Sequence, residues 1–310
     1  MAVLDRVRTA PHQPETRTAQ AKKGAAGLGV LLALVATVVW SGSFVATRGM
    51  ADSVPPVQAV FWRWIIAIAA VAPLAAREAW RQRDLIRRHL GYVSLASFFG
   101  IALYNTLVHQ AGLTTSASNM GMIMAASPVV MAGFARLGGQ KLGAVRTFGM
   151  LLAAFGVLLL VGKGSLTMDF AAGDLWMFGA ALSFASYSAL LKRKPAELSG
   201  LTFLLTTFVL GALMLAPAYA VSVAVQGGFQ VSAGTVGPLL YVGVFSSAVA
   251  FFAWNKAVSM IGAARAGVVY YLQPVCVALL SFLLLGEQTG PAQLLCMALI
   301  LGGVALGARR

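Results

Sequence analysis

The chain has 310 residues, of which 59% are apolar and only 10% charged, and its mean hydropathy is +0.82. Soluble domains usually carry about a quarter of their residues charged, so this composition excludes a soluble protein and predicts an integral membrane protein. A net charge of +14 would suit nucleic-acid binding if the basic residues shared a soluble face. Here they lie between apolar runs, so the expected surroundings are a lipid bilayer and not a nucleic acid.

The apolar runs are long enough to cross a bilayer as helices, which takes about 20 residues each. Ten such segments are expected, at residues 28–47, 57–76, 91–111, 119–136, 144–161, 173–191, 200–223, 236–256, 263–285 and 291–308. Barrel strands would alternate in polarity over about ten residues, and these runs do not. The predicted fold is therefore an all-α integral membrane protein with ten transmembrane helices.

The second half of the chain repeats the plan of the first half. Ala111 and Ala257 each precede a proline by 17 residues, namely Pro128 and Pro274. An even split puts five helices in each half, so the two repeats have opposite orientations in the membrane. Inverted repeats of this kind are typical of transporters whose site lies near the bilayer midplane. The predicted units are a disordered cytoplasmic tail at residues 1–26, a first repeat at 27–162 and a second repeat at 163–310.

The positions of lysine and arginine predict how the helices are oriented. If the N-terminus is cytoplasmic, 20 of the 23 basic residues fall on the cytoplasmic side, whereas Arg48 and Lys163 fall outside and Arg63 lies within the membrane. The positive-inside rule therefore puts both termini in the cytoplasm. The polar tail lacks the apolar core of a signal peptide.

Several motifs resemble the drug/metabolite transporter (DMT) superfamily, EamA-type. They are Trp40-Ser41-Gly42 ahead of a basic residue, Pro56 followed by Arg63, and a duplicated Ala…Pro…Gly pattern that ends in Gly286-Glu287. The resemblance covers residues 28–308 and implies export or exchange of small organic solutes, often amino acids, across the bacterial cytoplasmic (inner) membrane. The chain looks most like the bacterial exporters of aromatic amino acids. The first half has Gln140-Lys141 where the family commonly has an acid, so a role tied to that acid is in doubt there.

Polar residues inside the expected helices are few, and each costs free energy in lipid, so they mark the interior of the bundle. Segment 91–111 carries Tyr104, Asn105 and His109. An aromatic ring, an amide and an imidazole together would suit a zwitterion that has a ring. His109 is also a candidate proton carrier, or else it meets lipid headgroups near the outer end of its helix.

Segment 263–285 contains the most polar stretch of the membrane region, with Tyr270, Tyr271 and Gln273 ahead of Pro274. A proline removes a backbone donor, so Pro274 would expose a carbonyl one turn back, at Tyr270. Pro128 would do the same in segment 119–136. Paired breaks near the midplane would serve substrate binding and gating, and the alternative is a packing kink without ligand contact.

Further candidates for the substrate cavity are aromatic or flexible. Tyr187 and Trp254 are expected to form its walls, and Met120 and Met124 a pliable apolar surface. More often such methionines face lipid or the core.

Arg63 is the only full charge well inside a segment. It would either hold a substrate carboxylate or bond polar neighbours near the outer face, with Trp62 and Trp64 as an interfacial belt.

The chemistry that the sequence lacks narrows the function. No Asp or Glu lies in the middle of a segment, and there is no phosphate-binding glycine loop, HExxH helix or pair of acids at catalytic spacing. We therefore expect no cofactor, no metal, no direct use of ATP and no enzymatic activity. The predicted function is export or exchange of small organic solutes, most of all amino acids including aromatic ones, by alternating access. The alternative on the same scaffold is a multidrug exporter of lipophilic cations, and a membrane enzyme comes far behind.

Overall fold

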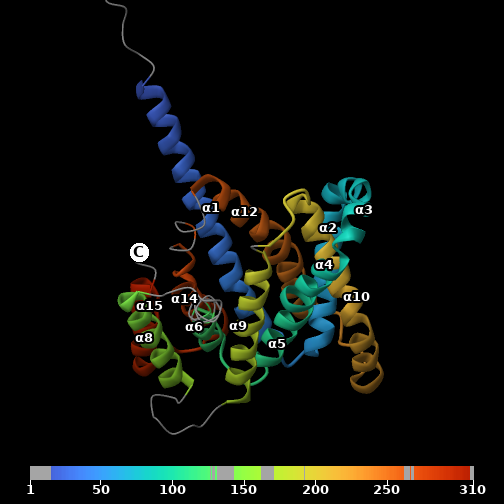
Figure 1. The fold of residues 1–310 in the computed structure, drawn as a ribbon. Coiled ribbons are helices and arrows are strands. Elements are labelled where there is room, and N and C mark those ends of the chain that lie inside the picture. Colours follow the sequence, from blue (N-terminus) through green and yellow to red (C-terminus); the bar gives the residue numbers. More distant parts are fainter. Residues whose placement is uncertain are drawn as a thin grey trace, which may run out of the picture.

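The computed structural model describes residues 15–125, 127, 130, 143–161, 171–191, 193–261, 266 and 269–307 (Figure 1). Every regular element within these residues is a helix, which confirms the predicted all-α class. In chain order the elements are α1 (Glu15–Gly49), α2 (Pro56–Arg81), α3 (Arg83–Arg88), α4 (Leu90–Ser97), η1 (Phe98–Leu103), α5 (Tyr104–Ala111), α6 (Ala117–Ala125), α8 (Ala144–Val161), α9 (Ala172–Leu191), α10 (Gly200–Gln226), α11 (Ala233–Leu240), η2 (Tyr241–Val249), α12 (Ala250–Ile261), α14 (Gln273–Leu285) and α15 (Pro291–Gly307).

The helices have the length and apolarity that a membrane demands. Among the described residues five spans are long enough to cross it, and they cover Ala26–Gly49, Pro56–Arg81, Leu90–Ala111, Gly200–Gln226 and Ala233–Ala257. Shorter apolar helices cover Thr147–Leu160, Gln273–Leu285 and Pro291–Leu306. The chain is thus a multi-pass membrane protein. Parts of the predicted segments 119–136 and 263–285 lie outside the described residues, so the count of ten stays a prediction.

The first helix starts earlier than predicted. The tail was expected to be disordered up to residue 26, but α1 begins at Glu15, and only residues 1–14 of the tail lie outside the described part of the chain. Alanine, lysine and glutamine are good helix formers, and adding turns to an existing helix is much easier than starting one. Figure 1 shows the first turns of α1 projecting beyond the other helices.

Two of the helices in the bundle widen into π-helical turns, η1 and η2. The second begins 143 residues after the first, at Tyr241 against Phe98, close to the spacing of the sequence repeat. A neighbour packs closely on a glycine of each: the Tyr187 ring on Gly100, and the Ile66 side chain on Gly243. A Cβ at either glycine would collide with that neighbour.

Each π-helix also keeps its backbone carbonyls partnered. Asn105 Nδ2 donates to the carbonyls of Gly100 and Ile101, both at 3.1 Å. Ser247 Oγ donates to the Val242 carbonyl at 2.8 Å. In both halves a polar side chain thus binds a carbonyl five residues earlier, which stabilises the wide turn from within.

The predicted helix over 263–285 is interrupted. Tyr271 and Leu272 form a turn, and α14 begins at Gln273 with Pro274 in its first turn. The sequence predicted a break at Pro274, with a packing kink as the alternative, but not that a new helix starts there. Pro274 lies in the first turn of α14, where no intrahelical partner exists for the N–H that proline lacks. Pro128, the matching residue of the first half, lies outside the described residues.

Candidate substrate site and comparisons with known proteins

Arg63 of α2 lies in the interior of the bundle, with only 5% of its surface exposed. Its Nε donates to Ser247 Oγ at 3.2 Å and its Nη2 to Ser246 Oγ at 3.3 Å, both from η2. Its guanidinium lies 5.2 Å from the ring centroid of Trp64. Among the described residues no carboxylate forms an ion pair with it. Its positive charge therefore contacts neutral hydroxyls and an aromatic ring.

The two tryptophans beside Arg63 differ in their surroundings. Trp64 is fully buried and packs on Phe208, with ring centroids 4.7 Å apart, whereas Trp62 is exposed. Only Trp62 is therefore placed to serve in an interfacial belt. The alternative role for Arg63 was to bond polar neighbours near the outer face, with Trp62 and Trp64 in an interfacial belt. The polar neighbours are present, but Trp64 is not part of such a belt.

Tyr104 lies between the two most polar parts of the interior. It is within electrostatic range of Arg63 and also of Tyr270. Its ring packs against Phe184 of α9, with centroids 5.5 Å apart. The phenol at the start of α5 therefore lies within electrostatic range of both the buried charge and the broken helix.

Next to these residues, three rings from different helices form an aromatic group. Trp40 of α1 lies with its ring centroid 5.4 Å from Trp254 and 5.9 Å from Tyr270, and these two lie 5.7 Å apart. Trp40 Nε1 donates to the backbone carbonyl of Ser246 at 2.9 Å, which links the group to a residue that contacts Arg63. Trp254 and Tyr270 were predicted site residues, whereas Trp40 was not, although its motif Trp40-Ser41-Gly42 stood out in the sequence.

Gln273 is 1% exposed and stands at the break ahead of α14. Its backbone carbonyl accepts a hydrogen bond from Ser41 Oγ at 3.3 Å, and its side chain bonds Tyr270. Within the described part of the chain, its Oε1 has no hydrogen-bond partner. A buried acceptor without a partner costs about 1–3 kcal/mol, so this oxygen is ready to accept a hydrogen bond from a ligand.

Ser127 is the matching residue of the first half, because it precedes Pro128 as Gln273 precedes Pro274. It is also buried, and no described residue is a hydrogen-bond partner of its Oγ. Both proline positions therefore carry an unsatisfied polar side chain.

Asn105 and His109 are buried, but their hydrogen bonds are made within the protein. Asn105 serves η1 as described above. His109 Nδ1 lies 2.9 Å from the Asn105 carbonyl, and its Nε2 lies 3.5 Å from Thr47 Oγ1 of α1. Burial contradicts the alternative in which His109 meets lipid headgroups.

The remaining predicted residues lie in packed surroundings. Met120 and Met124 are fully buried in a core cluster, where Gly121 of α6 packs on Val277 of α14. Tyr187 packs on η1. Tyr271 lies half-buried in the turn before α14.

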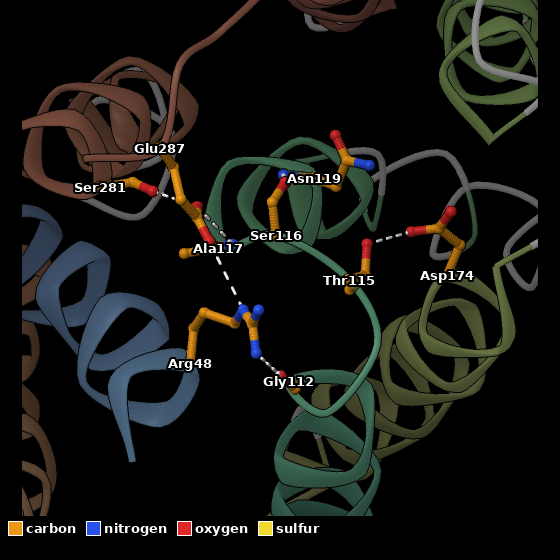
Figure 2. Close-up of polar contacts among 9 residues, drawn as sticks. All are labelled: Arg48, Gly112, Thr115, Ser116, Ala117, Asn119, Asp174, Ser281 and Glu287. Atoms are coloured by element: carbon orange, nitrogen blue, oxygen red, sulfur yellow. Dashed lines mark hydrogen bonds and ion pairs between the residues drawn. The ribbon is translucent and has the colours of Figure 1, made fainter. Parts of the chain in front are cut away.

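A polar cluster connects the helices at the end of the bundle where α1 finishes (Figure 2). The Arg48–Glu287 cluster, as we name it, centres on an ion pair of 3.5 Å between Arg48 Nε of α1 and Glu287 Oε1 beyond α14. Arg48 Nη1 donates to the Gly112 carbonyl at 3.1 Å. Glu287 Oε2 accepts from the backbone N–H of Ala117, the first residue of α6, at 3.1 Å, and also from Ser281 Oγ.

Two further contacts extend this cluster. Thr115 Oγ1 donates to Asp174 Oδ1 of α9 at 2.5 Å, and Gln293 Nε2 of α15 donates to Asn119 Oδ1 of α6 at 2.9 Å. Both join the first half of the chain to the second, as the Arg48–Glu287 pair does. From the sequence these acids were expected outside the middle of the segments and were not among the site residues. Gly286-Glu287 was noted only as part of a family motif.

A multi-pass helical bundle with a buried charge, an interrupted helix and repeated wide turns has the architecture of a membrane transporter. The chain belongs to the EamA-like transporter family, whose sequence pattern matches residues 27–162 and 171–308. This match confirms the resemblance to the EamA-type transporters of the DMT superfamily.

Known relatives carry transporter names as well. The chain is 26% identical over 233 residues to the uncharacterized transporter YyaM of Bacillus subtilis, covering 73% of this chain and 76% of that one. It is also 26% identical over 284 residues to the "Probable terminal-alkyne amino-acid exporter" of Streptantibioticus cattleyicolor, covering 90% and 93%. A protein of known crystal structure shares the fold with a TM-score of 0.58 and 20% identity, covering 90% of this chain and 95% of the other.

Proposed function

We propose that this transporter exports or exchanges amino acids, aromatic ones included, and that the solute binds in the middle of the bundle beside Arg63, Tyr104 and Gln273. The observation that carries the proposal is the surroundings of Arg63. Removing a cation from water costs several kcal/mol unless an anion compensates it, and the described residues supply no carboxylate. A solute carboxylate would fill that role with the paired hydrogen bonds that a guanidinium favours.

The other end of an amino acid requires hydrogen-bond acceptors. Gln273 Oε1 is a buried acceptor without a partner, and it stands where the helix is interrupted. An ammonium group has three donors and no acceptor, so it matches this oxygen. Tyr104, within electrostatic range of both Arg63 and Tyr270, would lie alongside the bound solute.

The side chain of the solute would meet the aromatic group of Trp40, Trp254 and Tyr270. Aromatic pairs with centroids 4.5–7 Å apart contribute about 0.5–1.5 kcal/mol beyond the area they bury, so an aromatic amino acid would gain from this surface. The name of the Streptantibioticus relative supports the amino-acid class. The buried Arg63 argues against the alternative of lipophilic cations, because like charges repel in an interior of low dielectric constant.

The proposal includes the architecture that alternating access needs. We infer ten transmembrane helices in two inverted repeats, at about 27–162 and 163–310, with both termini on the cytoplasmic side of the bacterial inner membrane. The distribution of lysine and arginine supports this orientation. The Arg48–Glu287 cluster then lies at the outer end, where its contacts between the halves would keep that end closed.

The test is counterflow in liposomes that contain the purified protein, with unlabelled phenylalanine inside, labelled phenylalanine outside and no ion gradient. We expect accumulation of label that protein-free liposomes do not show, and competition by other neutral amino acids. If no amino acid exchanges but a cationic dye moves under a proton gradient, the multidrug alternative is correct.

A further inference from the structure

A groove of about 750 Å³ lies between α2, α10 and the continuous η2–α12 helix. Its walls are apolar and include Leu74, Leu201, Val249 and Phe252, whereas Asn255 and Lys256 stand at one end. Its size is that of a ligand site, which typically measures about 300–1,000 Å³. None of the residues proposed to bind the transported solute lines it.

The groove opens toward the surrounding lipid. Its three walls belong to the long apolar spans Pro56–Arg81, Gly200–Gln226 and Ala233–Ala257. Leu74 is 74% exposed and Phe252 is 65% exposed, and such side chains would be costly to leave in water. In a bilayer this surface lies against acyl chains, so the natural occupant of the apolar part is a hydrocarbon chain.

The polar end of the groove lies where a lipid headgroup would be. Lys256 is exposed and next to the last residue of the span Ala233–Ala257. Further along α12, Ile261 packs on Gly29. Gly29 lies near the start of the span Ala26–Gly49, whereas Arg48 lies at the other end of that span. Among the described residues no acidic side chain lines the groove, and the first turn of α10 contains none. Lys256 places a positive charge and Asn255 an amide at this end of the groove, and both groups contain N–H donors that suit an anion.

We infer that this groove binds an anionic phospholipid of the surrounding membrane, with an acyl chain against α2, α10 and α12 and the phosphate on Lys256. A lysine attracts an anionic lipid by about 1 kcal/mol, which is about fivefold in affinity. The groove joins α2 of the first half to α10 and α12 of the second half. A lipid bound there packs at a junction between the two halves.

The test is native mass spectrometry of the full-length protein in detergent, titrated with phosphatidylglycerol or with phosphatidylcholine of the same acyl chains. We expect phosphatidylglycerol to bind more tightly, and Lys256→Gln to weaken it about fivefold while weakening phosphatidylcholine less, because the choline group offsets its phosphate charge. Equal binding of the two lipids, or an unchanged affinity in Lys256→Gln, would overturn the inference.

Two further variants locate the lipid. Gly200 lines the groove and has no atom within 4 Å of an added Cβ, so Gly200→Leu has space at this position to add apolar volume to the groove. We expect it to weaken both lipids. Arg88→Gln changes the charge by the same amount at an exposed position outside the groove and serves as the control. Unchanged lipid binding in Gly200→Leu, or a loss in Arg88→Gln equal to that in Lys256→Gln, contradicts the proposed position. Elution as a single species and an unchanged thermal midpoint show that each variant is folded.

Discussion

The Arg48–Glu287 cluster and the surroundings of Arg63 are both polar, but they differ in how their charges are compensated. In the cluster a cation meets an anion, and the anion also accepts a backbone N–H at the start of a helix. Among the residues that the structure describes, the buried cation Arg63 meets only hydroxyls and a ring, and Gln273 Oε1 has no partner. The first region is complete without a ligand and holds two halves together. The second lacks an anion and a donor, which an amino acid carries.

The largest effect is expected from Arg63→Met, which removes the uncompensated cation. Hydrogen bonds to a charged group contribute about 1.5–3 kcal/mol, so the half-saturating concentration for phenylalanine counterflow should rise about 10- to 100-fold. Because a buried charge without an anion is costly, the thermal midpoint should not fall. Arg63→Lys keeps the positive charge but loses the planar guanidinium. Its half-saturating concentration should lie between those of the wild type and Arg63→Met. A fall in midpoint with unchanged affinity would instead make Arg63 a packing residue.

Gln273→Leu should come next, with Gln58→Leu as its matched control. Both glutamines are buried, but Gln58 Nε2 donates to Ser222 Oγ at 3.1 Å and to the Gly227 carbonyl at 2.8 Å. Gln58→Leu should therefore lower the thermal midpoint and leave transport affinity unchanged. Gln273→Leu should weaken counterflow about tenfold with little loss of stability. If both variants changed transport affinity and thermal midpoint in the same way, the unsatisfied amide of Gln273 would behave no differently from the satisfied amide of Gln58.

Glu287 tests the other side of the comparison. Glu287→Ala removes both the ion pair and the acceptor at the Ala117 N–H, whereas Glu287→Gln keeps an acceptor and loses only the charge. We expect Ala117→Cys, introduced after replacement of Cys276 and Cys296, to react severalfold faster with a membrane-impermeant thiol reagent in Glu287→Ala. In Glu287→Gln the increase should be smaller, since partly exposed ion pairs contribute about 0–1 kcal/mol. Equal rates in all backgrounds would show that the cluster does not close this end.

The smallest effect is expected from Tyr104→Phe. The ring and its packing on Phe184 remain, and only the hydroxyl is lost. Affinity for phenylalanine should fall about two- to fivefold, in line with the net value of one hydrogen bond. Tyr104→Ala also removes the ring and should lower transport further while leaving expression intact. Wild-type counterflow in Tyr104→Ala would exclude this residue from the site.

The features that follow from local chemistry were predictable from the sequence. Apolar runs predicted the helices because lipid leaves a backbone few other choices. Pro274 marked a helix interruption because proline lacks a backbone donor, although the sequence did not show that a new helix starts there. Arg63 stood out because a charge inside an apolar run is rare.

The features that depend on distant residues were not predictable. Nothing in the local pattern shows that Asn105 will bond the carbonyls of η1, because the wide turn forms where the Tyr187 ring packs on Gly100. Met120 and Met124 look alike as cavity or core residues until their neighbours are known. Glu287 and Arg48 are 239 positions apart, and their pairing requires both halves to be in place.

The paired wide turns make each of these helices a joint. A π-helical turn contains one residue more than an α-helical turn. If the π-helical turn moved along the helix, the segment between its old and new positions would rotate while the helix stayed continuous. In η2 such a movement would turn Ser246 and Ser247 away from Arg63 by exchanging hydrogen bonds one at a time. The guanidinium would then lose its neutral partners as the helix turns, and its demand for an anion would rise.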